Sequence, residues 1–225
     1  MLNAWVVFPS ATLEKANAAV DAWSKQGYRT LIYQDIGAQV CNADVVRFGE
    51  FPGYYKIVNS LVEAAMCEGA DIITCAADDM LPDPHSTAQD IGRAYFATFP
   101  DGEGVLQACG DMQGMDERGT PAAARICGSP TFGRDWIMRS YEGRGPFWDG
   151  YGSFYGDEDL YNVAQMHKRL WMAREYTFQH RHWSFNWSDQ TWYQKRNSNL
   201  HWETDATLFA ERKGKGFPKS GLLAT

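Results

Sequence analysis

Apolar residues in the first part of the chain form two kinds of pattern. The continuous apolar run 4–8, which ends at Pro9, is typical of a strand buried on both faces. Apolar residues then recur at three- and four-residue spacing over 13–23, which predicts a helix that ends near Gly27. The run 28–33 has the composition of a second strand. The chain is therefore expected to open with a strand, a helix and a strand.

The same alternation continues to about residue 109. The patterns predict two further helices and two further strands, namely a helix over 53–69, a strand over 71–77, a helix over 86–96 and a strand over 105–109. Alternating strands and helices favour an α/β fold with a mostly parallel central sheet flanked by helices. Ligands bind such sheets beyond the carboxyl ends of the strands, where Ser10, Asp35 and Asp79 are expected.

The pattern changes after Gly128. Glycine, proline and aromatic residues crowd 128–156, which we expect to form long loops. A helix is expected within 160–174 and a late strand over 175–180. We divide the chain into a domain over 1–183 and a basic, Trp-rich extension over 184–225, which packs on the domain or trails from it.

Composition and charge narrow the class of protein. The 225 residues are 44% hydrophobic and 22% charged, as in globular proteins, and no run approaches the roughly 20 apolar residues of a membrane span. The five cysteines are scattered and the first residues do not resemble a secretory signal, so we expect a cytoplasmic protein with reduced thiols. The net charge is −12 over 1–159 and +5 over 160–225, which indicates either an anionic partner or a solvated tail.

Asp78 and Asp79 directly follow an expected buried strand. Two adjacent carboxylates are costly to place beside a sheet unless a positive group joins them. A divalent cation such as Mg²⁺ meets that need, because it is commonly bound by one or two carboxylates together with phosphate oxygens. The alternative is an ordinary turn, in which aspartate is common.

Two further groups have the chemistry of a catalytic site. The acidic run 157–159 precedes an expected helix, where a carboxylate can accept a proton from a hydroxyl or merely complement the helix dipole. His180 and His182 lie two residues apart, so in a strand both side chains point the same way. Either imidazole could join Asp79 around Mn²⁺, although a histidine pair is also common on protein surfaces.

The order of these signals resembles the nucleotide-sugar glycosyltransferases of the GT-A fold, most closely their family-2-like group, over about residues 4–183. In the family, an Asn-containing helix precedes the metal strand, a DxD motif follows that strand, and an acceptor-side segment, a GGFDE turn and an ED pair come later. The matching segments here are 59–65, Ala77–Met80, 128–134, 145–149 and Glu158-Asp159. The chain departs from the motif at Ala77, where the family has its first aspartate.

The resemblance implies a metal-dependent enzyme that transfers a sugar from a UDP- or GDP-sugar to an acceptor hydroxyl with inversion. It implies Asp159 as the general base, supported by Glu158, and Mn²⁺ or Mg²⁺ held by Asp79 with His180 or His182. The implied nucleotide-sugar-binding residues are Pro9, Ser10, Asp35, Lys56, Asn59 and Asp78. The implied acceptor-side residues are Arg134, Trp148 and Asp149.

Other functions stay open at this point. Ala77 favours a catalytically inactive binding module that kept the fold. A nucleotidyltransferase on a related sheet is less well supported, because the segment 8–12 lacks the glycine and basic residues that hold a triphosphate. The acceptor could be a glycan, a lipid-linked sugar, a protein or a modified DNA base. The DNA alternative rests on tryptophans interleaved with basic residues in 183–202 and beyond.

Overall fold

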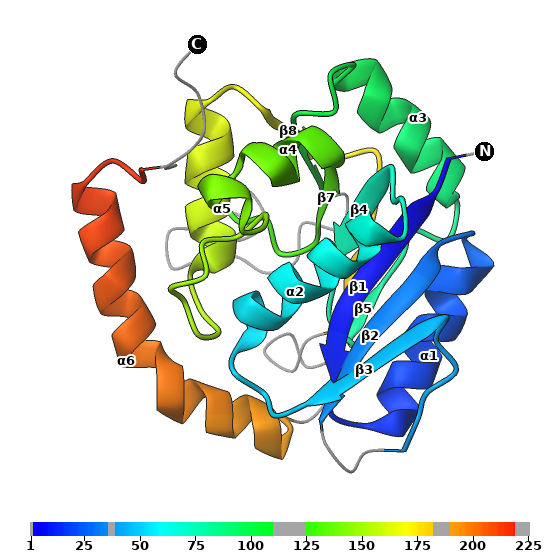
Figure 1. Ribbon diagram of the computed structural model, residues 1–225, viewed down its shortest axis with the longest axis horizontal. Helices are drawn as coiled ribbons and strands as arrows, with labels where there is room; N and C mark the ends of the chain where they lie inside the picture. Colours follow the sequence, from blue (N-terminus) through cyan, green and yellow to red (C-terminus); the bar gives the residue numbers. More distant parts are fainter. Residues whose placement is uncertain (1, 36–38, 110–124, 182–189, 219–225) are drawn as a thin grey trace.

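A seven-stranded sheet forms the centre of the fold, and six of its strands run parallel to one another (Figure 1). The computed structural model describes residues 2–35, 39–109, 125–181 and 190–218. The sheet order is β3-β2-β1-β4-β7-β6-β8, and β7 runs antiparallel to both of its neighbours. The α/β fold class with a mostly parallel sheet flanked by helices, expected from the alternating patterns, is thereby confirmed.

The strands are short. In chain order they are β1 (Ala4–Ser10), β2 (Arg29–Asp35), β3 (Val45–Gly49), β4 (Ile72–Cys75), β6 (Val105–Ala108), β7 (Pro130–Gly133) and β8 (Leu170–Ala173). A separate two-stranded sheet pairs β5 (Met80–Leu81) with β9 (Gln179–His180). The apolar residues of β1 are almost fully buried, as a strand covered on both faces by helices requires.

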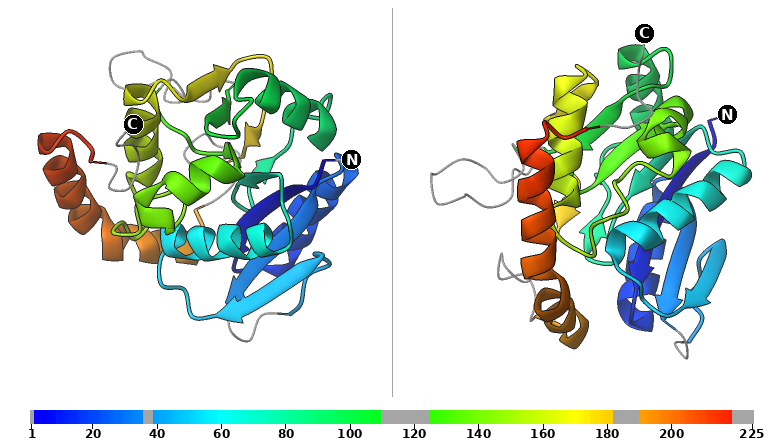
Figure 2. Two further views of the ribbon diagram at one scale, coloured as in Figure 1. Left: turned by 45° about the horizontal axis from the view of Figure 1, so that its top comes forward. Right: turned by 60° about the vertical axis from the view of Figure 1, so that its left-hand side comes forward.

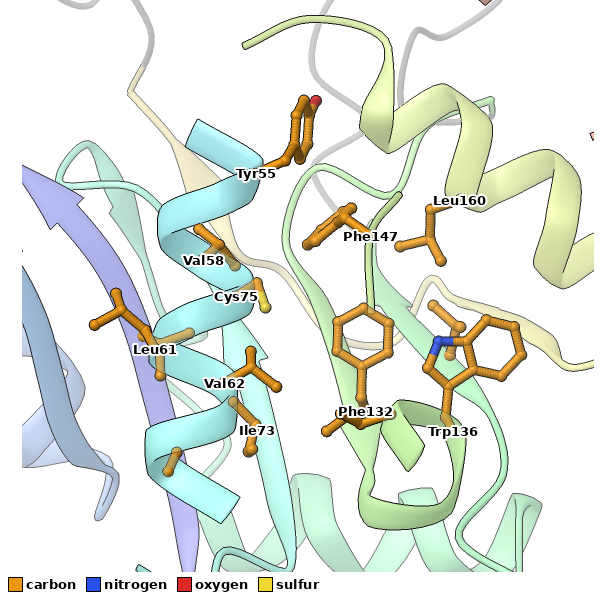
Figure 3. Packing of buried hydrophobic residues seen from close by; sticks show 14 of the residues in the cluster. Tyr55, Val58, Leu61, Val62, Ile73, Cys75, Phe132, Trp136, Phe147 and Leu160 are labelled. Atoms are coloured by element: carbon orange, nitrogen blue, oxygen red, sulfur yellow. The ribbon is translucent and has the colours of Figure 1, made fainter. Parts of the chain in front are cut away.

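Helices cover both faces of the sheet. The residues of α1 (Leu13–Lys25) and α3 (Ala88–Thr98) pack into one apolar cluster, and those of α2 (Tyr54–Cys67), α4 (Arg134–Arg139) and α5 (Gly156–Met166) pack into another. The second cluster includes Phe132 of β7 and Phe147, whose ring centroids lie 6.0 Å apart (Figure 3). Within the described ranges, no helix combines the length and apolar character needed to cross a lipid bilayer.

The last helix, α6 (Trp192–Gly214), runs along the outside of the domain (Figures 1 and 2). Two buried charged residues fasten it. The carboxylate of Asp205 accepts hydrogen bonds from the backbone N–H groups of Gly152, Ser153 and Phe154 at 2.8–2.9 Å. Arg212 binds Asp159 through Nε at 2.5 Å and through Nη2 at 3.1 Å. Helix α6 is therefore fixed to the segment 152–159.

Some expected elements were wrong. The helix expected over 160–174 begins earlier, at Gly156, and ends at Met166. Leu170–Ala173 forms β8 instead, after a turn in which Lys168 has φ 55°, and it pairs in parallel with β6. The segment 128–156 contains β7 and α4 as well as loops, and only Gln179–His180 of the expected late strand is extended in a ladder.

Substitution of Phe132 tests how much the apolar cluster beneath α2 contributes to stability. Phe132 is fully buried, so Phe132→Ala is expected to lower the free energy of unfolding by about 3–5 kcal/mol through lost burial and a residual cavity. The matched control is Phe48→Ala on edge strand β3, because Phe48 is 45% exposed and should change stability little. Urea denaturation of both variants measures the difference. Equal losses of stability would show that the cluster does not depend on Phe132.

Candidate functional site

A cleft of about 380 Å³ opens where β1, β2 and β4 end. Because these strands are parallel and adjacent, their carboxyl ends meet at one edge of the sheet. Six of the residues predicted from sequence line this cleft: Pro9, Ser10, Asp35, Asp78, Asp79 and His180. Segments far apart in the sequence thus contribute to one hollow that is rich in carboxylates.

Asp78 is held by hydroxyl groups from two sides of the cleft. Its Oδ2 accepts a hydrogen bond from Ser10 Oγ at 2.7 Å and a longer one from Tyr193 Oη at 3.4 Å. Burial, and then the adjacent charge of Asp79, raise the pKa of Asp78 to about 6. The two ionised carboxylates therefore repel each other, and a bound cation would offset that repulsion.

Asp79 and His180 face each other across the small sheet. Met80 of β5 is paired with His180 of β9, and this register brings His180 Nε2 to 3.3 Å from Asp79 Oδ1. The backbone N–H of Arg181 also donates to the carbonyl oxygen of Asp79 at 2.8 Å. The Asp79 side chain is largely buried and lines the cleft, so a ligand in the cleft can reach it.

The donor atoms at this point suit a hard divalent cation. Carboxylate and imidazole ligands fit Mn²⁺, and phosphate oxygens with water usually complete its coordination. Among the described residues, no group of three or more His, Cys, Asp and Glu side chains is arranged to hold a metal by itself. His182 lies outside the described residues. Asp79 and His180 thus offer a partial site that a phosphate-bearing ligand would complete.

Asp157 also lines the cleft, at the start of α5. Its Oδ1 accepts hydrogen bonds from the backbone N–H of Glu158 at 3.0 Å and from Tyr55 Oη at 3.4 Å. Burial raises the pKa of Asp157 above its usual value, against the opposing effects of these hydrogen bonds and of nearby His180. Asp157 is therefore a carboxylate of increased basicity that faces the cleft.

Asp159, the general base predicted from sequence, lies in the protein interior. Its side chain is 1% exposed, and its two oxygens are occupied by Arg212 and by the hydroxyl groups of Tyr141 and Tyr151. A general base needs a free oxygen at the reacting hydroxyl, so Asp159 acts here as the anchor of α6. Glu158 is partly buried, with Asp157, Arg125 and Lys213 as its charged neighbours, and lies outside the cleft lining.

Two predicted donor-binding residues also lie away from the cleft. Lys56 is exposed on α2 and does not contribute to the lining. The Asn59 amide binds the backbone of Phe147, donating from Nδ2 to the carbonyl oxygen at 2.8 Å and accepting from the N–H at 3.2 Å. Gly145, with φ 129°, packs so closely on Asn59 that a Cβ atom would meet it at 2.5 Å. Asn59 therefore holds the loop before Phe147.

The three predicted acceptor-side residues have other surroundings as well. Arg134 lines a separate hollow beside Asn59. The guanidinium of Arg212 lies 4.4 Å from the centroid of the Trp148 ring, which is thereby packed against the α6 anchor. Asp149 is partly exposed and lies 3.7 Å from Arg144. None of the three lines the described cleft.

Sequence analysis missed the contribution of α6. Tyr193, Arg196 and Asn197 line the cleft, as do Phe51 and Ser153. One local signal was available, because Thr191 and Gln194 form the T-x-x-Q pattern of a capping box. In the structure each side chain of this pair accepts from the other residue's backbone N–H, and this fixes where α6 begins.

No protein-family model matches the chain, and none of the curated proteins matches it. Among solved structures, A197 from STIV is similar with a TM-score of 0.47 and 13% identity, covering 80% of this chain and 85% of that chain. A mutant of Drosophila β1,4-galactosyltransferase 7, in complex with manganese, UDP-Gal and xylobiose, has a TM-score of 0.41, 16% identity and coverages of 88% and 79%. Mouse xyloside xylosyltransferase 1 has a TM-score of 0.39 and 10% identity, and the match covers 76% of this chain and 84% of that chain. Such distant similarity concerns the fold alone.

Asp78→Asn tests whether the ionised Asp78 carboxylate lowers the stability of the fold. Because the pKa of Asp78 is raised in the folded state from 3.8 to about 6, its contribution to stability is present below pH 4 and lost as the pH rises through 6. Asp78→Asn is therefore expected to raise the free energy of unfolding at pH 7 by about 1–3 kcal/mol. Urea denaturation between pH 4 and 7 in EDTA measures it.

The control for this experiment is Asp21→Asn, which removes an exposed carboxylate from α1. Its stability should follow the wild-type pH dependence. If Asp78→Asn destabilised the protein at pH 7, the ionised form of Asp78 would be the one that the fold favours.

Proposed function

We propose that the chain is a metal-dependent glycosyltransferase that moves a sugar from a nucleoside diphosphate to an acceptor hydroxyl. The observation that supports this most is the meeting of Asp78, Asp79, His180 and Asp157 in one cleft at the carboxyl edge of a parallel sheet. A cation site beside a separate, more basic carboxylate is what transfer from a diphosphate to a hydroxyl requires. The sequence resemblance to GT-A enzymes supports the same reaction.

The donor would lie along the strand ends. Asp35 is suited to accept hydrogen bonds from ribose hydroxyls or from the base, and the backbone at Pro9 and Ser10 would border the nucleotide. Asp79 and His180, together with Asp78, would hold Mn²⁺ or Mg²⁺, which neutralises the charge that develops on the departing diphosphate. Asp78 would be kept in place by Ser10 Oγ.

Asp157 replaces Asp159 as the general base in this proposal. The acceptor oxygen forms a bond to the anomeric carbon while the bond from that carbon to the diphosphate oxygen breaks. The proton of the acceptor hydroxyl passes to Asp157, whose Oδ1 is already engaged by Tyr55 and Glu158, so Oδ2 is the accepting atom. A single displacement of this kind inverts the anomeric centre.

Two substitutions separate the roles of these carboxylates. Asp79→Asn should abolish metal-dependent release of UDP or GDP from a panel of nucleotide sugars, because the cation loses the carboxylate that lies beside His180. Asp157→Asn should lower turnover by about 10²–10⁴-fold while donor affinity is retained, since a base acts in the chemical step. Release of nucleoside diphosphate with Mn²⁺ and calorimetric donor binding measure both effects.

Asp21→Asn is again the matched control and should keep full activity, because Asp21 is exposed on α1. Wild-type protein that binds donors without turnover would identify an inactive binding module. Release of pyrophosphate from a nucleoside triphosphate, in place of diphosphate from a nucleotide sugar, would identify a nucleotidyltransferase.

A further inference from the structure

The wall of the cleft opposite the strand ends comes from α6. The strand ends and α5 contribute four carboxylates, Asp35, Asp78, Asp79 and Asp157. Helix α6 contributes Arg196, and among the described residues that line the cleft no other is a lysine or arginine. A ligand with phosphate groups could therefore bind the guanidinium of Arg196 on α6.

Aromatic rings rather than carboxylates surround Arg196. Its guanidinium lies 5.7 Å from the ring centroid of Phe51 and 5.2 Å from that of Trp192. Within the described part of the chain, it makes no ion pair. Its planar fork of N–H donors matches phosphate geometry, so Arg196 is suited to bind an anionic ligand in the cleft.

Two oxygen atoms in the same cleft have no hydrogen-bond partner among the residues that the structure describes. Asn197 Oδ1 and Ser153 Oγ are both buried, and neither makes a hydrogen bond to any described residue. Buried polar atoms without partners are uncommon in folded proteins. Both atoms accept hydrogen bonds, so a ligand with hydroxyl groups would satisfy them.

Helix α6 also reaches the carboxylate pair. Tyr193, one turn before Asn197, donates its hydroxyl hydrogen bond to Asp78 Oδ2 at 3.4 Å. The side chains of α6 therefore stand over the acidic strand ends where the diphosphate would lie. A nucleotide sugar combines the phosphate groups that suit Arg196 with the hydroxyl groups that suit Asn197 and Ser153.

We propose that α6 completes the donor site, with Arg196 binding a phosphate of the nucleoside diphosphate and Asn197 with Ser153 binding hydroxyls of a sugar ring. This inference rests on the proposed function, since it assigns the donor's groups to the α6 wall. Arg196 and Asn197 lie beyond residues 4–183, over which the chain resembles glycosyltransferases, and Ser153 lies between two of the matching segments.

Calorimetric titration of the full chain with UDP, GDP, a UDP-sugar and inorganic pyrophosphate, each with Mn²⁺, tests the assignment. Arg196→Gln should weaken the binding of all phosphate ligands by about 10–100-fold. Arg196→Lys should recover part of the affinity, because it keeps the charge without the fork. Asn197→Ala should weaken UDP-sugar binding by about 5–10-fold and leave pyrophosphate binding unchanged.

The matched control is Lys195→Gln, which removes the same charge from an exposed position next to Arg196. If Arg196→Gln binds phosphate ligands like Lys195→Gln, the α6 assignment is overturned, and the proposed function stands as long as Asp79→Asn loses activity. If Arg196→Gln weakens pyrophosphate binding but wild type turns over no nucleotide sugar, the phosphate site stands and the glycosyltransferase proposal fails. If wild type binds none of these ligands, both are overturned. Thermal melts confirm that each variant is folded.

Discussion

The crowding of carboxylates at one edge of the sheet is the constraint around which the rest of the structure is arranged. Like charges in a partly buried cleft repel one another and lose hydration, so each needs a compensating contact. The chain provides hydroxyl groups of Ser10 and Tyr193 at Asp78, and an imidazole at Asp79. These contacts come from β1, β9 and α6. The packing of these three elements at the cleft therefore offsets the repulsion between its carboxylates.

The sequence predicted the first half of the fold well, because strands buried on both faces and helices with one apolar face leave clear patterns. It failed where tertiary contacts decide the structure. Edge strand β3 exposes Arg47 and Phe48, so it lacks a continuous apolar run. Strand β8 follows α5 after a short turn without glycine or proline, so its apolar residues continued the expected helix. Helix α6 has few buried residues and is held by Asp205 and Arg212 instead.

The acidic pair at the end of β4 was predicted from sequence as a site, but the choice among three consecutive acids was not. Successive residues of a helix point about 100° apart, so 157–159 must face three directions. Asp159 forms an ion pair with Arg212, which lies 53 residues further along the chain, whereas Asp157 faces the cleft. His180 reaches Asp79 through the register of two-residue strands, which no periodicity reveals. The Asn59 amide could bind a ligand or a loop equally well, and in the structure it binds the backbone of Phe147.

The anchors on α6 also fix one wall of the cleft relative to the segment 152–159. Asp205 and Arg212 are seven residues apart, about two helical turns, and both grip the segment 152–159. That segment presents Ser153 and Asp157, while α6 presents Arg196 and Asn197. The contacts that hold α6 therefore also set the positions of all four side chains relative to one another. The Tyr193–Asp78 hydrogen bond, at 3.4 Å, joins this group of side chains to the carboxylate pair.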